Sequence, residues 1–318
     1  MIPLPLLGTN LPVIVQVAVC ATFGVLTMAS IVCTLCKRLA PARNWTELSA
    51  RISTWWYLAA GFTLAIAFDN AVSIAALGLV SFIAFKEFMS CIPTRRADHA
   101  VLALAYLAVL MQYCWVYVGW YDMFIIFIPV LVFLALTISM ALTGDTRGFL
   151  RSAGVVHWGV MTSGFCLSHL AYLLYLPATH SGGSTGISLL FFIVVTTQLN
   201  DVFQYLWGKA FGAHRVIPTV SPNKTWEGLL GAIATTTVLT CLAGPSFTPL
   251  EGWRLPLAGL LIGIGGFVGD IVMSAVKRDL GIKDYGRMLP GHGGILDRVD
   301  SVMLTAPLFF HYLRYFYY

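Results

Sequence analysis

Long runs of apolar residues, separated by short polar segments, fill the sequence from one end to the other. A helix that crosses the roughly 30 Å core of a bilayer needs about 20 such residues. With charged residues and Pro/Gly clusters as boundaries, the pattern predicts ten spans, at about residues 12–36, 52–68, 70–91, 99–119, 122–143, 153–177, 186–207, 228–245, 255–276 and 299–317. Only Asp69 and Asn70 separate the second run from the third, so nine spans is the alternative if one of them is re-entrant. The predicted fold is therefore all-α, a polytopic transmembrane helix bundle.

The composition excludes a disordered chain and argues against an ordinary soluble domain. Charged residues make up 10% of the 318 residues, and apolar residues make up 58%. Soluble domains have about 25% charged residues, and disordered chains combine low hydrophobicity with high charge. The seven cysteines show no disulfide pattern, and most lie in apolar runs, where cysteine behaves as a small apolar residue.

The basic residues alternate between loops. Seventeen of the 19 Lys and Arg residues lie in or beside every second loop, beginning with the loop after the first span. The positive-inside rule places these loops in the cytoplasm and both chain ends on the other side. The first ten residues contain no Lys or Arg, so we expect no cleaved signal peptide. We expect a multi-pass protein of the bacterial inner membrane with no nucleic-acid partner.

The chain changes character near its middle. Residues 1–185 consist of hydrophobic segments joined by loops of little chemical content. Residues 186–318 contain nearly all the dense polar clusters, with predicted cytoplasmic loops at 209–227 and 277–298. This contrast predicts an N-terminal group of transmembrane helices followed by a C-terminal transmembrane region that carries out the chemistry.

Two acidic residues, Asp201 and Asp270, lie inside apolar spans. A carboxylate in hydrocarbon is costly, so such a residue usually faces a water-filled or protein-lined site. Both lie about 9–12 Å from the cytoplasmic end of their helices at a rise of 1.5 Å per residue. A protonated Asp in a helix–helix hydrogen bond is the alternative, and it explains one such residue better than two at matching depth. Ser274 and Lys277 share a helical face with Asp270, because the three are spaced i, i+4, i+7.

The stretch from Ser274 to Asp300 is rich in glycine, with nearly as many acidic as basic residues. Glycine lets backbone N–H groups approach phosphates closely, and carboxylates beside phosphates are typical of Mg²⁺ sites. The candidate residues are Gly291, Gly293 and Gly294 for such a nest, Lys277, Arg278, Lys283 and Arg298 for phosphate charge, and Asp297 and Asp300 for the metal. The alternative, a solvated basic loop, does not account for the acidic residues.

The segment 221–228 is the second polar cluster, and we expect it to form another wall of the same site. Its proline fixes a turn, and Lys224 is the expected anion contact. Thr225 can begin a helix with Glu227 in its first turn.

The stretch from Ser274 to Asp300 resembles the signature of the phosphatidate cytidylyltransferase (CDP-diacylglycerol synthase) family. The fixed positions of that signature are all met, by Ser274, Lys277, Arg278, Lys283, Asp284, Gly286, Pro290, His292, Gly293, Gly294, Asp297, Arg298 and Asp300. The segment 221–228 is similar to the family's S-P-x-K-T-W-E/Q-G, and Asn200-Asp201 to its upstream acidic helix. After Asp201, residues 202–205 replace the small residues that many bacterial members carry. The resemblance covers about residues 196–302.

The resemblance implies an enzyme that converts CTP and phosphatidate to CDP-diacylglycerol and pyrophosphate with one or two Mg²⁺ ions, in the cytoplasmic half of the bilayer. It also suggests a homodimer surrounded by membrane lipid. It implies that Asp270 and Asp297 are metal ligands, and we expect Asp201 and Asp300 to be further, weaker candidates. The residues expected to be catalytic are Asp270, Asp297, Lys277 and Arg298. The residues expected to bind substrate are Ser221, Asn223, Lys224, Ser274, Arg278, Lys283, Asp284, His292, Gly293 and Gly294. A cytidylyltransferase for another lipid phosphate, such as a polyprenyl phosphate, stays open. So does an ion-coupled transporter that uses Asp201 and Asp270.

Overall fold

The computed structural model describes residues 11–40, 45–93, 99–177, 185–289 and 293–318. Within them the chain is helical apart from one short hairpin. The elements are α1 (Val13–Leu39), α2 (Thr46–Ala67), α3 (Asn70–Ser90), α4 (His99–Val118), α5 (Tyr121–Ile126), η2 (Phe127–Val132), α6 (Phe133–Leu142), α7 (Phe149–Gly159), η3 (Val160–Cys166), α8 (Leu167–Tyr172), η4 (Leu173–Tyr175), α9 (Gly186–Phe211), β1 (Arg215–Ile217), β2 (Ser221–Thr225), α10 (Trp226–Phe247), α11 (Arg254–Asp279) and α12 (Leu296–Tyr317). The all-α prediction is confirmed.

Each predicted span corresponds to a helix or to a continuous helical run. Two of these runs, α5–η2–α6 and α7–η3–α8, contain a π-helical segment in their middle. Within the described residues, seven helices are long and apolar enough to cross a membrane. The helices α2 and α3 have 22 and 21 residues, so neither is a short re-entrant piece. Asp69 separates them by accepting a hydrogen bond from the backbone N–H of Val72, at 2.9 Å, which caps α3.

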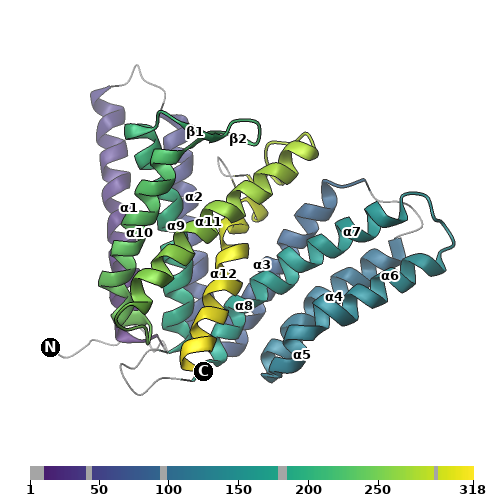
Figure 1. The fold of residues 1–318 in the computed structure, drawn as a ribbon. Helices are drawn as coiled ribbons and strands as arrows, with labels where there is room; N and C mark the ends of the chain where they lie inside the picture. The colour runs from purple at the N-terminus through teal and green to yellow at the C-terminus, as the bar shows by residue number, and fades with distance from the viewer. Residues whose placement is uncertain (1–10, 41–44, 94–98, 178–184, 290–292) are drawn as a thin grey trace.

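The helices form two groups that diverge toward one end of the molecule (Figure 1). The helices α1, α2, α9 and α10 stand together, and α3 to α8 form a tilted group beside them (Figure 1). The helix α12 lies between the groups, and it packs on α9, α11, α3 and α8. The described basic loops, including 209–225 and 280–289, lie at the end where the groups diverge (Figure 1).

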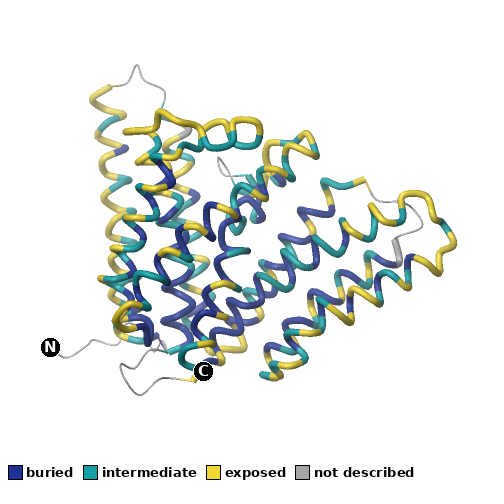
Figure 2. The backbone as a smooth tube through the Cα atoms, in the orientation of Figure 1, coloured by how far each residue is buried: buried dark blue, intermediate teal, exposed yellow. Residues whose placement is uncertain are grey.

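Burial follows the expectation for a protein surrounded by lipid. The tube in Figure 2 is buried where α9, α12, α3 and α8 meet, and exposed along α1 and the outer side of α6. The exposed side chains there are themselves apolar, such as Val25, Met28 and Val32 on α1 and Leu134 and Ile138 on α6. An apolar outer surface is stable in hydrocarbon and costly in water, so it identifies the faces that contact lipid.

Glycines in α11 bring three helices close together. A Cβ atom on Gly266 would lie 3.0 Å from Nδ2 of Asn200 on α9. A Cβ atom on Gly269 would lie 2.8 Å from the backbone oxygen of Asp300 on α12. Small residues permit such backbone approach between membrane helices. Because Asp270 follows Gly269 directly, this packing sets the helices that carry Asp201, Asp270 and Asp300 against one another.

The structure corrects the boundaries of both predicted cytoplasmic loops. The helix α11 continues to Asp279 and α12 begins at Leu296, so the loop predicted at 277–298 spans only 280–295. Lys277 and Arg278 thus occupy the last turn of α11, where cations interact favourably with the helix dipole. The loop predicted at 209–227 contains the antiparallel hairpin β1–β2.

Thr225 begins α10, as predicted. Its side chain accepts a hydrogen bond from the backbone N–H of Gly228 at 3.1 Å. Glu227 lies in the first turn and accepts hydrogen bonds from the backbone N–H groups of Ala213 and His214, at 3.1 and 3.2 Å. These bonds join the start of α10 to the segment that leads into β1, and they hold the hairpin against the helix ends.

Candidate active site

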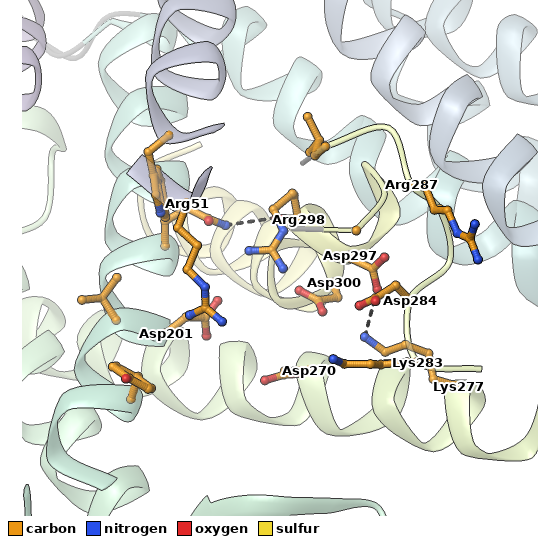
Figure 3. Close-up of a pocket in the computed structure, with 17 residues that line it drawn as sticks. Arg51, Asp201, Asp270, Lys277, Lys283, Asp284, Arg287, Asp297, Arg298 and Asp300 are labelled. Carbon is orange, nitrogen blue, oxygen red and sulfur yellow. Dashed lines mark hydrogen bonds and ion pairs between the residues drawn. The ribbon is translucent and has the colours of Figure 1, made fainter. Parts of the chain in front are cut away.

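A cavity of about 760 Å³ lies at the end where the helix groups diverge. Helices α2, α9, α11 and α12 and the loop after α11 contribute its walls (Figure 3). The lining residues are Arg51, Trp55, Gln198, Asp201, Val202, Tyr205, Asp270, Lys277, Lys283, Asp284, Gly286, Arg287, Leu289, Gly293, Asp297, Arg298 and Asp300. All four acids predicted to bind metal therefore face one space.

Asp297 is the most buried of these acids, with 3% of its surface exposed. Its Oδ1 accepts a hydrogen bond from Nζ of Lys277 at 3.0 Å, in a buried ion pair. Its Oδ2 accepts the backbone N–H groups of Tyr285 and Gly294, both at 2.9 Å. The carboxylate therefore holds together α11, the loop 280–295 and the first turn of α12.

The backbone of the loop bends around Asp297. Gly293 has φ of +79°, and a Cβ atom there would lie 2.6 Å from Oδ2 of Asp297. Leu289 donates its N–H to the backbone oxygen of Gly293 at 2.8 Å, which closes the bend. His292 lies outside the described residues, so its predicted role stays a prediction. Gly294 contacts Asp297 through its N–H and does not itself line the cavity.

Tyr285 anchors the other side of the loop. Its hydroxyl donates to the backbone oxygen of Met273 at 3.1 Å, and its ring lies 5.5 Å from Nζ of Lys277. Burial raises the pKa of the Tyr285 hydroxyl above its ordinary value, so the hydroxyl remains a donor.

Asp270 is paired with Lys224, which comes from the hairpin. Nζ of Lys224 lies 2.5 Å from Oδ2 of Asp270 and 2.5 Å from Oε1 of Gln204 on α9. Ser274 donates its hydroxyl to Oδ1 of Asp270 at 3.2 Å, as their shared helical face predicts. Lys224 thus ties β2 to α9 and α11 at the edge of the cavity.

Asp201 and Asp300 meet across the contact between α9 and α12. The hydroxyl of Ser301 donates to Oδ2 of Asp201 at 2.8 Å, and Gln204 donates to Oδ1 at 3.4 Å. Asp300 accepts the backbone N–H of Ser301 at 2.8 Å. One serine therefore links the two acids.

Other predicted substrate-binding residues lie beside the cavity. Arg278 donates its Nε to the backbone oxygen of Val220 at 3.1 Å, which fixes the hairpin to the end of α11. Ser221 and Asn223 lie on β2, with Asn223 exposed. Lys283 and Asp284 line the cavity, as predicted for groups that contact substrate.

Glu87 on α3 is a residue that the sequence reasoning missed. This buried carboxylate accepts the backbone N–H of Leu296 at 2.8 Å, at the start of α12. It also lies against the loop, because a Cβ atom on Gly294 or Gly286 would come within 2.3 or 2.6 Å of its oxygens. The sequence feature that could have identified Glu87 is an acidic residue, next to Lys86, inside the apolar run 70–91.

The acids suit a hard cation such as Mg²⁺, since carboxylate oxygens are the protein ligands it prefers. Within the described residues, no three His, Cys, Asp or Glu side chains form a ready group of metal ligands. Mg²⁺ is usually held by one or two carboxylates together with substrate phosphates and waters. One or two of Asp270, Asp297 and Asp300, which line an open cavity, fit that mode.

Comparison with known proteins identifies relatives over most of the chain. Residues 49–316 match the cytidylyltransferase family. The uncharacterized protein YnbB of Escherichia coli (strain K12) is 41% identical over 293 residues, 92% of this chain and 96% of its own length.

Two staphylococcal enzymes match a shorter segment. The phosphatidate cytidylyltransferases of Staphylococcus haemolyticus (strain JCSC1435) and Staphylococcus aureus (strain COL) are each 41% identical over 154 residues. That segment is 46% of this chain and 58% of each enzyme. These matches favour a nucleotidyltransferase over an ion-coupled transporter.

Proposed function

The chain belongs to the cytidylyltransferase family, and on that premise we propose that it transfers CMP from CTP to phosphatidate, which gives CDP-diacylglycerol and pyrophosphate. The observation that carries this proposal is that four acids and several cations line one shared cavity. It lies in a multi-pass membrane protein, at the end that bears the basic loops. A soluble triphosphate and a lipid phosphate can meet only at such a boundary.

The reaction needs alignment of charged groups more than it needs a strong base. A non-bridging oxygen of the phosphatidate monoester attacks the α-phosphorus of CTP and forms the new P–O bond. The bond between that phosphorus and the bridging oxygen to the β-phosphorus breaks, and its electron pair leaves with pyrophosphate. The attacking oxygen is already anionic, so the protein must counter charge and hold the groups in line.

The lysines and arginines of the site supply this counter-charge. Lys277 and Lys283 line the cavity on α11 and the following loop, and Arg298 lines it on α12. Bound Mg²⁺ would neutralise the phosphate oxygens and polarise the α-phosphorus. Asp270 and Asp297 are the residues we propose for it, with Asp201 and Asp300 next to them.

The positive-inside rule gives the site its proposed side of the membrane. The basic loops converge where the cavity lies, which supports a site in the cytoplasmic half of the bilayer, where CTP is available. We propose the bacterial inner membrane as its location.

Pyrophosphate release by the purified protein tests the proposal. We expect release with CTP and not with ATP or GTP, with phosphatidate as acceptor, and loss of release when EDTA removes Mg²⁺. Asp297→Asn should abolish turnover while the protein still extracts as a folded species. Asp279→Asn changes an exposed acid at the C-terminal end of α11, and this matched control should keep wild-type turnover. Absence of CTP-dependent release with every lipid phosphate would overturn the proposal.

A different lipid phosphate is the second candidate acceptor. Val202 and Tyr205 line the cavity directly beside Asp201. These larger side chains change the shape of the acceptor end of the site. A polyprenyl phosphate in the same assay separates the two candidates, because the better acceptor gives the higher kcat/KM.

A further inference from the structure

The cations that line the cavity fall into two groups. Lys277, Lys283 and Arg287 belong to the end of α11 and the loop after it. Arg51 comes from α2, and in Figure 3 it extends into the cavity toward Asp201, at the opposite end from Lys283 and Arg287. Asp270 and Asp300 lie between these two ends (Figure 3). The site therefore has a cationic group on each side of its acids.

The end that holds Arg51 is bordered by apolar and aromatic side chains. Trp55, one turn along α2, lines the cavity together with Val202 and Tyr205 of α9. Val202 and Tyr205 are also exposed, on a helix apolar enough to span the membrane, so this wall lies where the cavity meets the outer surface of α9.

The helices α2 and α9 touch farther from the basic end. The rings of Phe62 on α2 and Phe191 on α9 stack there, with centroids 6.2 Å apart. Nearer the basic end, side chains of the same two helices line the cavity. The space between α2 and α9 in that half of the bilayer therefore runs from the lipid side to the acids.

An in-line displacement needs its two phosphate groups on opposite sides. The attacking oxygen approaches the α-phosphorus from one side, and pyrophosphate leaves from the other. If the acids and their metal hold the α-phosphate, one cationic group must bind the acceptor and the other the β- and γ-phosphates. The apolar wall assigns the acceptor to the end that holds Arg51.

We infer that Arg51 binds the phosphate monoester of the lipid acceptor, which reaches the site between α2 and α9 along Trp55 and Val202. This inference rests on the proposed function. A guanidinium group matches a phosphate with two parallel hydrogen bonds. Arg298 supports the same assignment, because its Nε is buried without a hydrogen-bond partner among the described residues. Two guanidinium groups favour a dianionic monoester over the singly charged diesters of bulk phospholipids.

Steady-state kinetics in mixed micelles tests the inference through a pair of substitutions. We expect Arg51→Gln to raise the KM for phosphatidate at least about tenfold, the factor for one lost charge-assisted hydrogen bond, with the KM for CTP within about twofold. Arg51→Lys should show a smaller rise in the KM for phosphatidate. Arg287→Gln, at the other end of the cavity, is the matched control and should raise the KM for CTP while leaving that for phosphatidate unchanged.

A second arm separates a lipid acceptor from a phosphate free in solution. Glycerol 3-phosphate has the same monoester without acyl chains, and we expect no turnover with it. Equal turnover with glycerol 3-phosphate and with phosphatidate would overturn the inference that the acceptor reaches the site through the bilayer. An Arg51→Gln enzyme that changes both KM values equally, or that for CTP alone, would overturn the assignment of Arg51. An inactive wild-type protein would instead overturn the proposed function.

Discussion

Asp297 combines a structural task with its proposed chemical one. Its carboxylate pairs with Lys277 and accepts two backbone N–H groups of the loop. The atoms that would contact a metal therefore also fix the backbone that approaches the substrate. Loss of the charge and loss of the side chain should have separable effects.

Asp297→Asn and Asp297→Ala separate these two tasks. Both variants remove the negative charge beside Lys277, so we expect each to lose stability and to lower kcat by about 10²-fold or more. Asparagine keeps an oxygen that accepts the N–H groups of Tyr285 and Gly294, whereas alanine also leaves these two buried groups unpaired, which should cost about 1–3 kcal/mol more. Thermal unfolding in detergent and turnover, each measured for the two variants, check these expectations. Equal destabilisation by the two variants would contradict the structural task.

Gly293→Ala tests how closely the loop must approach the same carboxylate. An alanine there is strained at φ +79°, and its Cβ would lie 2.6 Å from Oδ2 of Asp297. Gly281→Ala is the matched control, since Gly281 has φ +67° and open space around it. Both should lose about 1–2 kcal/mol of stability, and only Gly293→Ala should lose most of its turnover. Comparable activity of the two variants would show that the approach to Asp297 is unimportant.

The C-terminal turn of α3 supports the loop 280–295 and the start of α12. Glu87 accepts the first N–H of α12, and Cys91 donates to the backbone oxygen of Tyr285 at 3.3 Å. The ring of Phe88 lies 6.5 Å from that of Tyr285. One element from the hydrophobic N-terminal part thus positions a loop about 200 residues later in the chain.

Substitution of Glu87 tests whether the end of α3 supports this loop. Glu87→Ala leaves the N–H of Leu296 unpaired and buried, so we expect a loss of about 1–3 kcal/mol and a lower kcat. Glu87→Gln keeps an acceptor oxygen, so it should keep most of the wild-type stability and most of the wild-type kcat. Lys86→Ala changes the exposed neighbour and should behave as wild type. If Glu87→Gln is as impaired as Glu87→Ala, the charge of Glu87, and not its hydrogen bond, matters.

At the scale of the whole molecule, the positions of the helices can be predicted from the sequence, but the contacts between the helices cannot. Apolar runs of about 20 residues locate each span to within a few residues, because a helix in lipid must satisfy its own backbone. The acids at 201, 270, 297 and 300 are identifiable because charge is rare in such a chain. The role of Glu87, the position of Arg51 and the pairing of Lys224 with Asp270 depend on how distant helices cross, which local pattern does not encode.

The orientation of the molecule in the membrane is testable with a reporter. Tyr318 lies at the end remote from the basic loops (Figure 1), so alkaline phosphatase fused after it should be active, because this enzyme folds only in an oxidising compartment. The same reporter inserted after Gly144, in the exposed loop between α6 and α7, should be inactive. The reverse pattern of activities would invert the proposed topology.

The two ion pairs in the cavity also bear on how the protein is made. A carboxylate buried in a membrane protein without a partner is costly, yet Asp270 and Asp297 each have a lysine beside them in the structure. Their charges are balanced before any nucleotide or metal arrives. We therefore expect the chain to insert and fold without waiting for its ligands. We also expect substrate binding to exchange counter-ions, with the two lysines turning from carboxylates to phosphates.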